Sequence, residues 1–218
     1  MRPSFTILEL VIVIIIIGIL VSTVSIFIPN NNLRLAADDL AKNIRFTESL
    51  ALKDDKYQPF PKNNTSQEEN RSKYWFRRFW QIKIAKNKTD NFYFVVYSDD
   101  DLDNNADVGE MAKDPLTNKY INGNYYSNTS DKDANLSTFG ITNISYIYKN
   151  ITHNIISGKP LRIYFDNYGN VYINKNNNKS FNIFNNMKLL TAKLKIILNQ
   201  NNKAIILIIT SNGLVYIK

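Results

Sequence analysis

An apolar segment between Phe5 and Ile28 constrains this chain more than any other feature, and its single charged residue is Glu9. As a helix rising about 1.5 Å per residue, the segment is long enough to cross about 30 Å of hydrocarbon. A carboxylate inside such a span costs roughly 2.5–3.5 kcal/mol, so Glu9 is expected to have a partner or a function. The sequence therefore predicts a transmembrane helix with a functional acid near its start.

The residues around Glu9 follow a specific order: a short leader with one basic residue, then Phe5 and Thr6, then Glu9 and an apolar run. This order resembles the signature of type IV prepilins, the family of type IV pilins and of the pseudopilins of type II secretion and DNA-uptake machines. Ser4 stands where the family prefers glycine. The resemblance implies cleavage between Ser4 and Phe5 by a prepilin peptidase, followed by N-methylation of Phe5.

The same resemblance implies a role for Glu9 in filament assembly, where it pairs with the free amino group of Phe5 in a neighbouring subunit. A buried carboxylate and a buried ammonium are each costly alone and tolerable as a close pair, which agrees with that role. The alternative is an uncleaved signal anchor in which Glu9 is tolerated near the membrane interface.

Charge around the apolar segment predicts its orientation. Arg2 precedes the segment and no strong basic cluster follows it closely, so the positive-inside rule places the N-terminus in the cytoplasm and the bulk of the chain outside. The expected location is the bacterial inner membrane, single-pass with a periplasmic domain, and a periplasmic pseudopilus after assembly. The leader is too short for an ordinary secretory signal, so the apolar segment is expected to stay.

A helical pattern resumes after Pro29, which is expected to kink or briefly interrupt the helix. Apolar or small residues then recur at spacings of four and three, which is typical of one helix face. They are Leu33, Ala37, Leu40, Ile44, Thr47 and Ala51. The sequence thus predicts a leader over 1–4, a transmembrane helix over 5–28, an amphipathic stem helix over 29–53 and a β-rich globular domain over 54–218.

Residues 53–73 are polar and indicate an exposed loop, and short runs of β-branched and aromatic residues follow. The predicted strands are Tyr74–Ile84, Phe92–Tyr97, Ile141–Tyr148, Leu161–Phe165, Val171–Ile173, Ala192–Leu198, Ala204–Ile209 and Leu214–Ile217. Hairpin turns between closely spaced strands favour antiparallel pairing. The predicted fold class is α+β and pilin-like: a long N-terminal α-helical spine, made of the transmembrane half and the stem, packed on antiparallel β-sheet.

The C-terminal half narrows the resemblance to minor pseudopilins of the H type, the GspH/FimT-like group. Its strands are similar to that group's final strand–glycine–strand pattern, with turn glycines at Gly169 and Gly213. The stem also resembles the Arg-x-x-Glu stretch of that group, through Arg45 and Glu48. A minor subunit is favoured over a major one, because residues 53–154 form a large block for a repeating structural subunit.

The segment SDDDLDNNADVGE has oxygen-bearing side chains at the spacing of an EF-hand loop, in which they surround Ca²⁺. The first, third, fifth, seventh, ninth and twelfth positions are Asp99, Asp101, Asp103, Asn105, Asp107 and Glu110. The sixth position, normally glycine, is Asn104, a residue that tolerates left-handed backbone. Calcium is the one cofactor that the sequence suggests, and a solvated acidic turn is the open alternative.

Basic residues alternate with aromatic residues between 71 and 88, in a chain of net charge +8. A nucleic-acid surface needs such a pattern for contacts to the backbone and for stacking on bases. The candidate residues are Arg77, Arg78 and Lys83. The alternative is a β-strand with one aromatic core face and solvated cations.

No catalytic constellation is present in the sequence. His153 is the one histidine and there is no cysteine, which excludes Cys–His pairs and histidine metal sites.

We therefore expect a structural protein and no enzyme: a minor pseudopilin of a type II secretion-type pseudopilus, assembled through its N-terminal helix. Its expected partners are other pseudopilins, the prepilin peptidase, the inner membrane, and a secreted cargo or DNA. The alternatives are a DNA-binding minor subunit of a DNA-uptake or type IV pilus, and a membrane-anchored calcium-binding adhesive domain.

Overall fold

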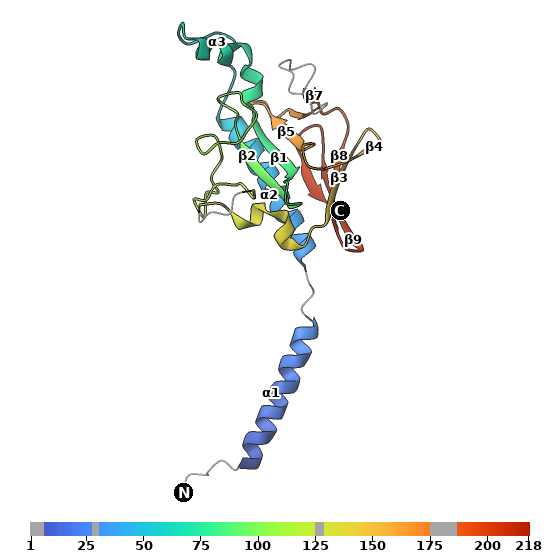
Figure 1. The fold of residues 1–218 in the computed structure, drawn as a ribbon. Helices are drawn as coiled ribbons and strands as arrows, with labels where there is room; N and C mark the ends of the chain where they lie inside the picture. Colours follow the sequence, from blue (N-terminus) through green and yellow to red (C-terminus); the bar gives the residue numbers. More distant parts are fainter. Residues whose placement is uncertain (1–6, 28–30, 125–128, 175–186) are drawn as a thin grey trace. The chain divides into compact units, whose positions relative to one another are not determined.

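The computed structural model describes residues 7–27, 31–124, 129–174 and 187–218, with side chains in the first helix over residues 7–20 (Figure 1). The chain divides into two compact units, Met1–Asn31 and Asn32–Lys218. The first unit contains helix α1 (Ile7–Phe27). In its described part the second unit contains α2 (Asn32–Lys53), α3 (Ser66–Lys73), three short 3-10 helices and ten strands.

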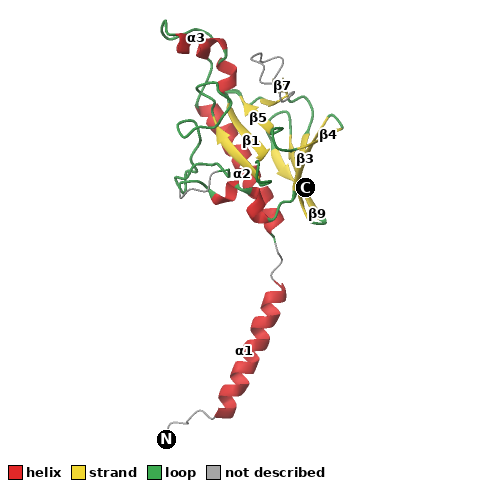
Figure 2. Cartoon of the chain, in the orientation of Figure 1, coloured by secondary structure: helices red, strands yellow, loops and turns green. Residues whose placement is uncertain are grey.

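The ten strands form two five-stranded sheets in which all pairings are antiparallel (Figure 2). The first sheet has the order β2-β1-β5-β6-β7 and the second β10-β9-β8-β3-β4. The strands are β1 (Trp80–Lys86), β2 (Phe92–Tyr97), β3 (Asn143–Tyr148), β4 (Ile151–Asn154), β5 (Leu161–Phe165), β6 (Val171–Asn174), β7 (Met187–Leu189), β8 (Leu194–Gln200), β9 (Lys203–Ile209) and β10 (Val215–Ile217). The 3-10 helices are η1 (Trp75–Arg78), η2 (Lys132–Ala134) and η3 (Leu136–Phe139).

Helix α2 contributes to one hydrophobic core together with both sheets, and it runs behind β1 and β2 in Figure 1. Its buried face includes all of the residues predicted to form a stripe: Leu33, Ala37, Leu40, Ile44, Thr47 and Ala51. Ala36 and Ala41 are also buried, and such small side chains let strands approach the helix closely. Burial of this amphipathic face, more than intrinsic helix propensity, is what stabilises α2.

The last hairpin of the chain is held against α2 by two contacts, which we call the C-terminal clasp. Arg45 donates from Nη2 to the carbonyl oxygen of Val215 at 2.6 Å. Gly213 has φ of +81°, and a Cβ added there would overlap the carboxylate of Glu48. Glycine is therefore required at position 213 for two reasons: the backbone is left-handed there, and the carboxylate of Glu48 lies too close for a side chain.

The predicted long N-terminal spine is wrong, and with it the predicted fold class. The described residues form a two-sheet, antiparallel, β-rich protein with three separate α-helices, and none of them is a long apolar spine. The physical reason is that α1 and α2 belong to different compact units and differ in character. Helix α2 is amphipathic and covered by the sheets on one face, so the apolar pattern of α1 does not continue through it.

The prediction of a membrane anchor is corrected as well. Within the part of the chain that the structure describes, no helix combines the length and the apolar character that crossing a bilayer requires. The transmembrane helix predicted over 5–28 and the single-pass inner-membrane location with a periplasmic domain are therefore wrong.

The polar block predicted as an exposed loop contains helix α3. Its N-cap is Thr65, whose hydroxyl accepts from the backbone N–H of Glu68 at 3.4 Å. Acidic residues lie in its first turn and basic residues in its last, an arrangement that the helix dipole favours. The strand predicted from Tyr74 begins only at Trp80, because a 3-10 turn occupies Trp75–Arg78.

Candidate functional site

The acidic loop, residues 99–110, follows directly after β2 and gathers three carboxylates. Asp99, Asp101 and Asp103 each offer one oxygen, and these oxygens all lie within 4.8 Å of one another. Asp99 is 2% exposed, whereas Asp101 and Asp103 are exposed. Three carboxylates this close repel one another strongly unless a cation or a set of donors balances them.

The backbone of the loop turns in the way that an EF-hand spacing requires. Asn104, at the position where glycine is usual, has φ of +69°. Its N–H donates to both carboxylate oxygens of Asp99 at 3.2 Å. At the end of the loop, Glu110 accepts from the N–H of Asp101 at 2.9 Å and of Asp107 at 3.4 Å, so its carboxylate folds back across the loop.

The six predicted calcium ligands thus divide into two groups. The first is the cluster of Asp99, Asp101 and Asp103. In the second group, Asn105 donates from its backbone and side chain to Asp103 at 2.6 and 2.7 Å, and the carbonyl oxygen of Asp107 accepts from Glu110 at 2.9 Å. Every ligand is a hard oxygen donor, which fits Ca²⁺ better than a transition metal.

Asp99 is the buried carboxylate of the cluster, and the groups around it act on its pKa in opposite directions. Burial raises the pKa of Asp99 to about 6, and the neighbouring carboxylates of Asp101 and Asp103 add to the effect. The guanidinium of Arg77 lies 3.4 Å from its Oδ2 and, with the N–H of Asn104, acts in the opposite direction. Arg77 therefore supplies part of the positive charge that a calcium ion would bring.

Calcium titration of the full chain is expected to give a measurable heat with a dissociation constant in the weak range of such loops, about 10⁻⁴–10⁻³ M. We expect a low affinity because Arg77 already contacts Asp99 and backbone N–H groups already donate to both oxygens of Glu110. Asp101→Asn should abolish the heat. Glu69→Gln, an exposed acid of α3 outside the loop, is the matched control and should change nothing. Heat-silent injections of Ca²⁺ into the wild-type chain would show that the loop is a solvated acidic turn.

The residues predicted to contact nucleic acid lie against this loop. Arg77 donates to the carbonyl oxygen of Leu102 at 2.6 Å and is 8% exposed. Arg78 donates to Asp100 Oδ1 and to Gln58 Oε1, both at 2.9 Å. Among the described contacts, both arginines thus hold the acidic loop to the start of β1, and neither is presented as an exposed cation.

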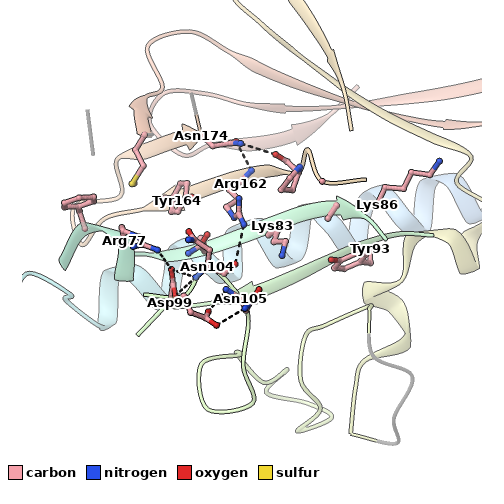
Figure 3. Close-up of a pocket in the computed structure, with 17 residues that line it drawn as sticks. Arg77, Lys83, Lys86, Tyr93, Asp99, Asn104, Asn105, Arg162, Tyr164 and Asn174 are labelled. Carbon is pink, nitrogen blue, oxygen red and sulfur yellow. Dashed lines mark hydrogen bonds and ion pairs between the residues drawn. The ribbon is translucent and has the colours of Figure 1, made fainter. Parts of the chain in front are cut away.

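A cavity of about 330 Å³ opens between the acidic loop and the first sheet (Figure 3). Its charged lining consists of Arg77, Lys83, Lys86 and Arg162 together with Asp99 and Asp103. Lys83 and Arg162 are direct partners in the register of β1 and β5, so their side chains leave the same face of the sheet. Sequence reasoning identified Lys83 but missed Arg162.

The signal for Arg162 was present in the alternation of its strand. Leu161, Ile163 and Phe165 are buried in the core, so Arg162 and Tyr164 lie on the opposite face. What the sequence does not show is which strand pairs with β5. The register of β1 with β5 decides that a second cation, Lys83, stands opposite Arg162.

Lys83 carries the largest resolved pKa change among the described lysines. Burial, and secondarily the charge of Arg162, lower the pKa of Lys83 from 10.5 to about 8. Asp103 and Asp99 act in the opposite direction and only partly offset it. The folded state therefore holds this lysine in a setting that disfavours its charge.

The charge of Lys83 should destabilise the folded state, and the size of this destabilisation should depend on pH. Because the folded-state pKa is depressed, the penalty is fully present below about pH 8 and is relieved as the pH rises toward 10.5. Lys83→Met is expected to raise the free energy of unfolding by about 2 kcal/mol at pH 7, with the gain shrinking toward pH 10. Urea unfolding of both chains at the two pH values measures it. A gain that does not change with pH would contradict the assignment.

The three residues of the prepilin signature belong to the first unit. Ser4 and Phe5, the predicted processing and methylation site, lie outside the described residues. Glu9 lies in the first turn of α1 and is exposed. The helix around it is apolar on all sides over residues 7–20.

Comparison of the chain with models of protein families, with curated proteins and with solved structures gives no match. Its function is therefore inferred from the residues themselves.

Proposed function

We propose that this chain is a structural subunit of a filament, a minor pseudopilin of the type II secretion type that assembles through its N-terminal helix. The observation that carries the proposal is the surface of α1. Along residues 7–20 its large apolar side chains are exposed, from 40% at Val13 to 83% at Ile7. A helix that is apolar all round has to be covered by other apolar surface.

A bundle of α1 helices from several subunits would cover this surface on every side. In such a bundle Glu9 would lie among apolar side chains, where a carboxylate is tolerated only with a close cationic partner. An amino group freed by cleavage between Ser4 and Phe5 is the partner that the signature implies. Pairing of Glu9 with it would also fix the axial offset between neighbouring subunits.

The C-terminal clasp supports the narrower proposal of an H-type minor subunit. The residues that the resemblance singles out on the stem, Arg45 and Glu48, contact the turn and strand of the last hairpin, at Val215 and Gly213. The second unit would then be the part that makes subunit-specific or cargo-specific contacts. The DNA-binding alternative gains no support from Arg77 and Arg78, since both are engaged with the acidic loop.

Cysteine cross-linking tests the assembly, because the chain has no cysteine of its own. Ile14→Cys places a thiol on α1, and Leu116→Cys, at a loop residue that is 92% exposed, is the matched control. In cells that supply a prepilin peptidase and partner pseudopilins, Ile14→Cys should give cross-linked subunits and Leu116→Cys should not. Adding Glu9→Leu to the Ile14→Cys chain should lower the cross-linked fraction at least about tenfold, as expected for loss of a buried ion pair.

Two results would contradict the proposal. The first is equal cross-linking at both cysteine positions, which would indicate nonspecific association. The second is an intact chain, still beginning with Met1 by mass spectrometry, whose cross-linking is unaffected by Glu9→Leu.

A further inference from the structure

Two cations face each other across β1 and β5 at the wall of the 330 Å³ cavity. Lys83 and Arg162 are direct cross-strand partners, and both line the cavity (Figure 3). Like charges directly opposite each other destabilise a sheet. A folded protein that retains such a pair at a half-buried position requires an explanation.

The described side chains do not neutralise this pair. Within that part of the chain, Lys83 has no carboxylate at ion-pair distance, since the ion pairs involve other residues. Arg162 donates from Nη2 to the carbonyl oxygen of Asn104 at 3.4 Å and has the buried hydroxyl of Tyr97 as a neighbour, while its Nε makes no well-formed hydrogen bond among the described residues. Neutral partners of this kind leave the charge of a buried guanidinium uncompensated, which is costly.

The two carboxylates in the cavity wall are already engaged. Asp99 accepts from Arg77 at 3.4 Å and from the N–H of Asn104 at 3.2 Å. Asp103 accepts from the backbone and side chain of Asn105 at 2.6 and 2.7 Å. They act on Lys83 only from a distance, and Lys83 and Arg162 both remain in the lining of the cavity.

We propose that the cavity binds a small oxyanion, the phosphate group of a low-molecular-weight ligand, between Lys83 and Arg162. The planar guanidinium matches two oxygens of such a group, and the ammonium adds a point charge beside it. A doubly charged phosphate matches the two cations better than a singly charged carboxylate does. The volume of about 330 Å³ is at the lower end of ligand sites and leaves room for a small organic body beside Tyr93 and Tyr164.

The electrostatic state of Lys83 is consistent with this site. Burial and the charge of Arg162 lower the pKa of Lys83, whereas Asp103 and Asp99 in the acidic loop raise it. The other charged residues that line the cavity are Lys86 and Arg77. A bound anion would supply the missing opposite charge. The charge of Lys83 would then destabilise the fold only while the cavity is empty. Loss of stability of this kind is common at residues that are selected for binding.

Inorganic phosphate is the probe for the test, added to the full chain with chloride at equal ionic strength as reference. Phosphate is expected to raise the melting temperature and to give a binding heat, with acetate weaker. Lys83→Gln should weaken phosphate binding at least about tenfold. Lys88→Gln, which removes the same charge from an exposed turn outside the cavity, should leave binding unchanged.

A second readout separates binding from a structural role. Without phosphate, Lys83→Gln should melt above the wild-type chain, because it removes a charge that is disfavoured by burial and, secondarily, by repulsion from Arg162. Arg162→Gln is the second variant and should lose the phosphate effect as well. Phosphorus NMR of wild-type samples needs no variant: broadening of the phosphate signal supports the site. No broadening and no heat at millimolar phosphate, or a phosphate effect that survives Lys83→Gln, would overturn the proposal.

Discussion

Leu40→Ala is expected to lower the free energy of unfolding of the second unit by about 3–4 kcal/mol, because it opens a cavity where helix and both sheets meet. Leu40 is 0% exposed and lies in the core cluster formed by α2 with strands of the two sheets. The helix backbone fixes the position of residue 40, and strands on both sides leave little freedom to collapse. Urea unfolding of the full chain, followed by the near-ultraviolet signal of the aromatic residues, measures the change.

The same helix provides the control for this substitution. Leu35 lies on the opposite side of α2 and is 53% exposed. Leu35→Ala makes the same chemical change without a cavity and should stay within about 0.5 kcal/mol of wild type. Similar losses in both variants would show that α2 does not connect the two sheets in the way described.

Gly123→Ala is the second large effect, with an expected loss of about 3 kcal/mol or more. A Cβ at Gly123 would overlap the backbone carbonyl of Ala134, and Gly123 itself donates from its N–H to Phe94 at 3.0 Å. Both neighbours are backbone atoms, so no side-chain rotation relieves the overlap. The segment would have to move away from β2 and lose that hydrogen bond.

Gly109→Ala is the matched control, because nothing lies within 4 Å of a Cβ at that position. Thermal unfolding should leave it close to wild type, while Gly123→Ala melts far lower. If the two alanine variants melted together, the packing of residue 123 against η2 would be wrong.

The sequence predicted the strands well wherever burial alternates along them. β5 shows why: its apolar residues enter the core at every second position and form a period-two pattern. β4 was missed because all four of its residues are exposed, so no such pattern exists. β7 has only three residues, too few for a period to be recognised.

The N-terminal half of the fold was predicted less well, for a physical reason. The apolar run around Glu9 and the stripe around Leu40 were interpreted as one helical spine, yet they belong to α1 and α2 in separate compact units. Helical periodicity reports on each segment and carries no information on whether two segments join into one rigid rod.

The candidate site was predictable where it is local. The acidic loop is a contiguous motif, so the cluster of Asp99, Asp101 and Asp103 and the left-handed Asn104 follow from spacing and residue type. The cavity depends on the pairing of distant strands. Nothing in a single strand indicates that Lys83 will stand opposite Arg162.

The C-terminal clasp has a consequence for synthesis of the protein. The hydrogen bond from Arg45 to Val215 joins residues 170 positions apart. Helix α2 is therefore synthesised long before the strand that it holds, and its apolar face has no such partner until residue 215 has left the ribosome. During translation this face and the nascent apolar strands are candidates for protection by chaperones.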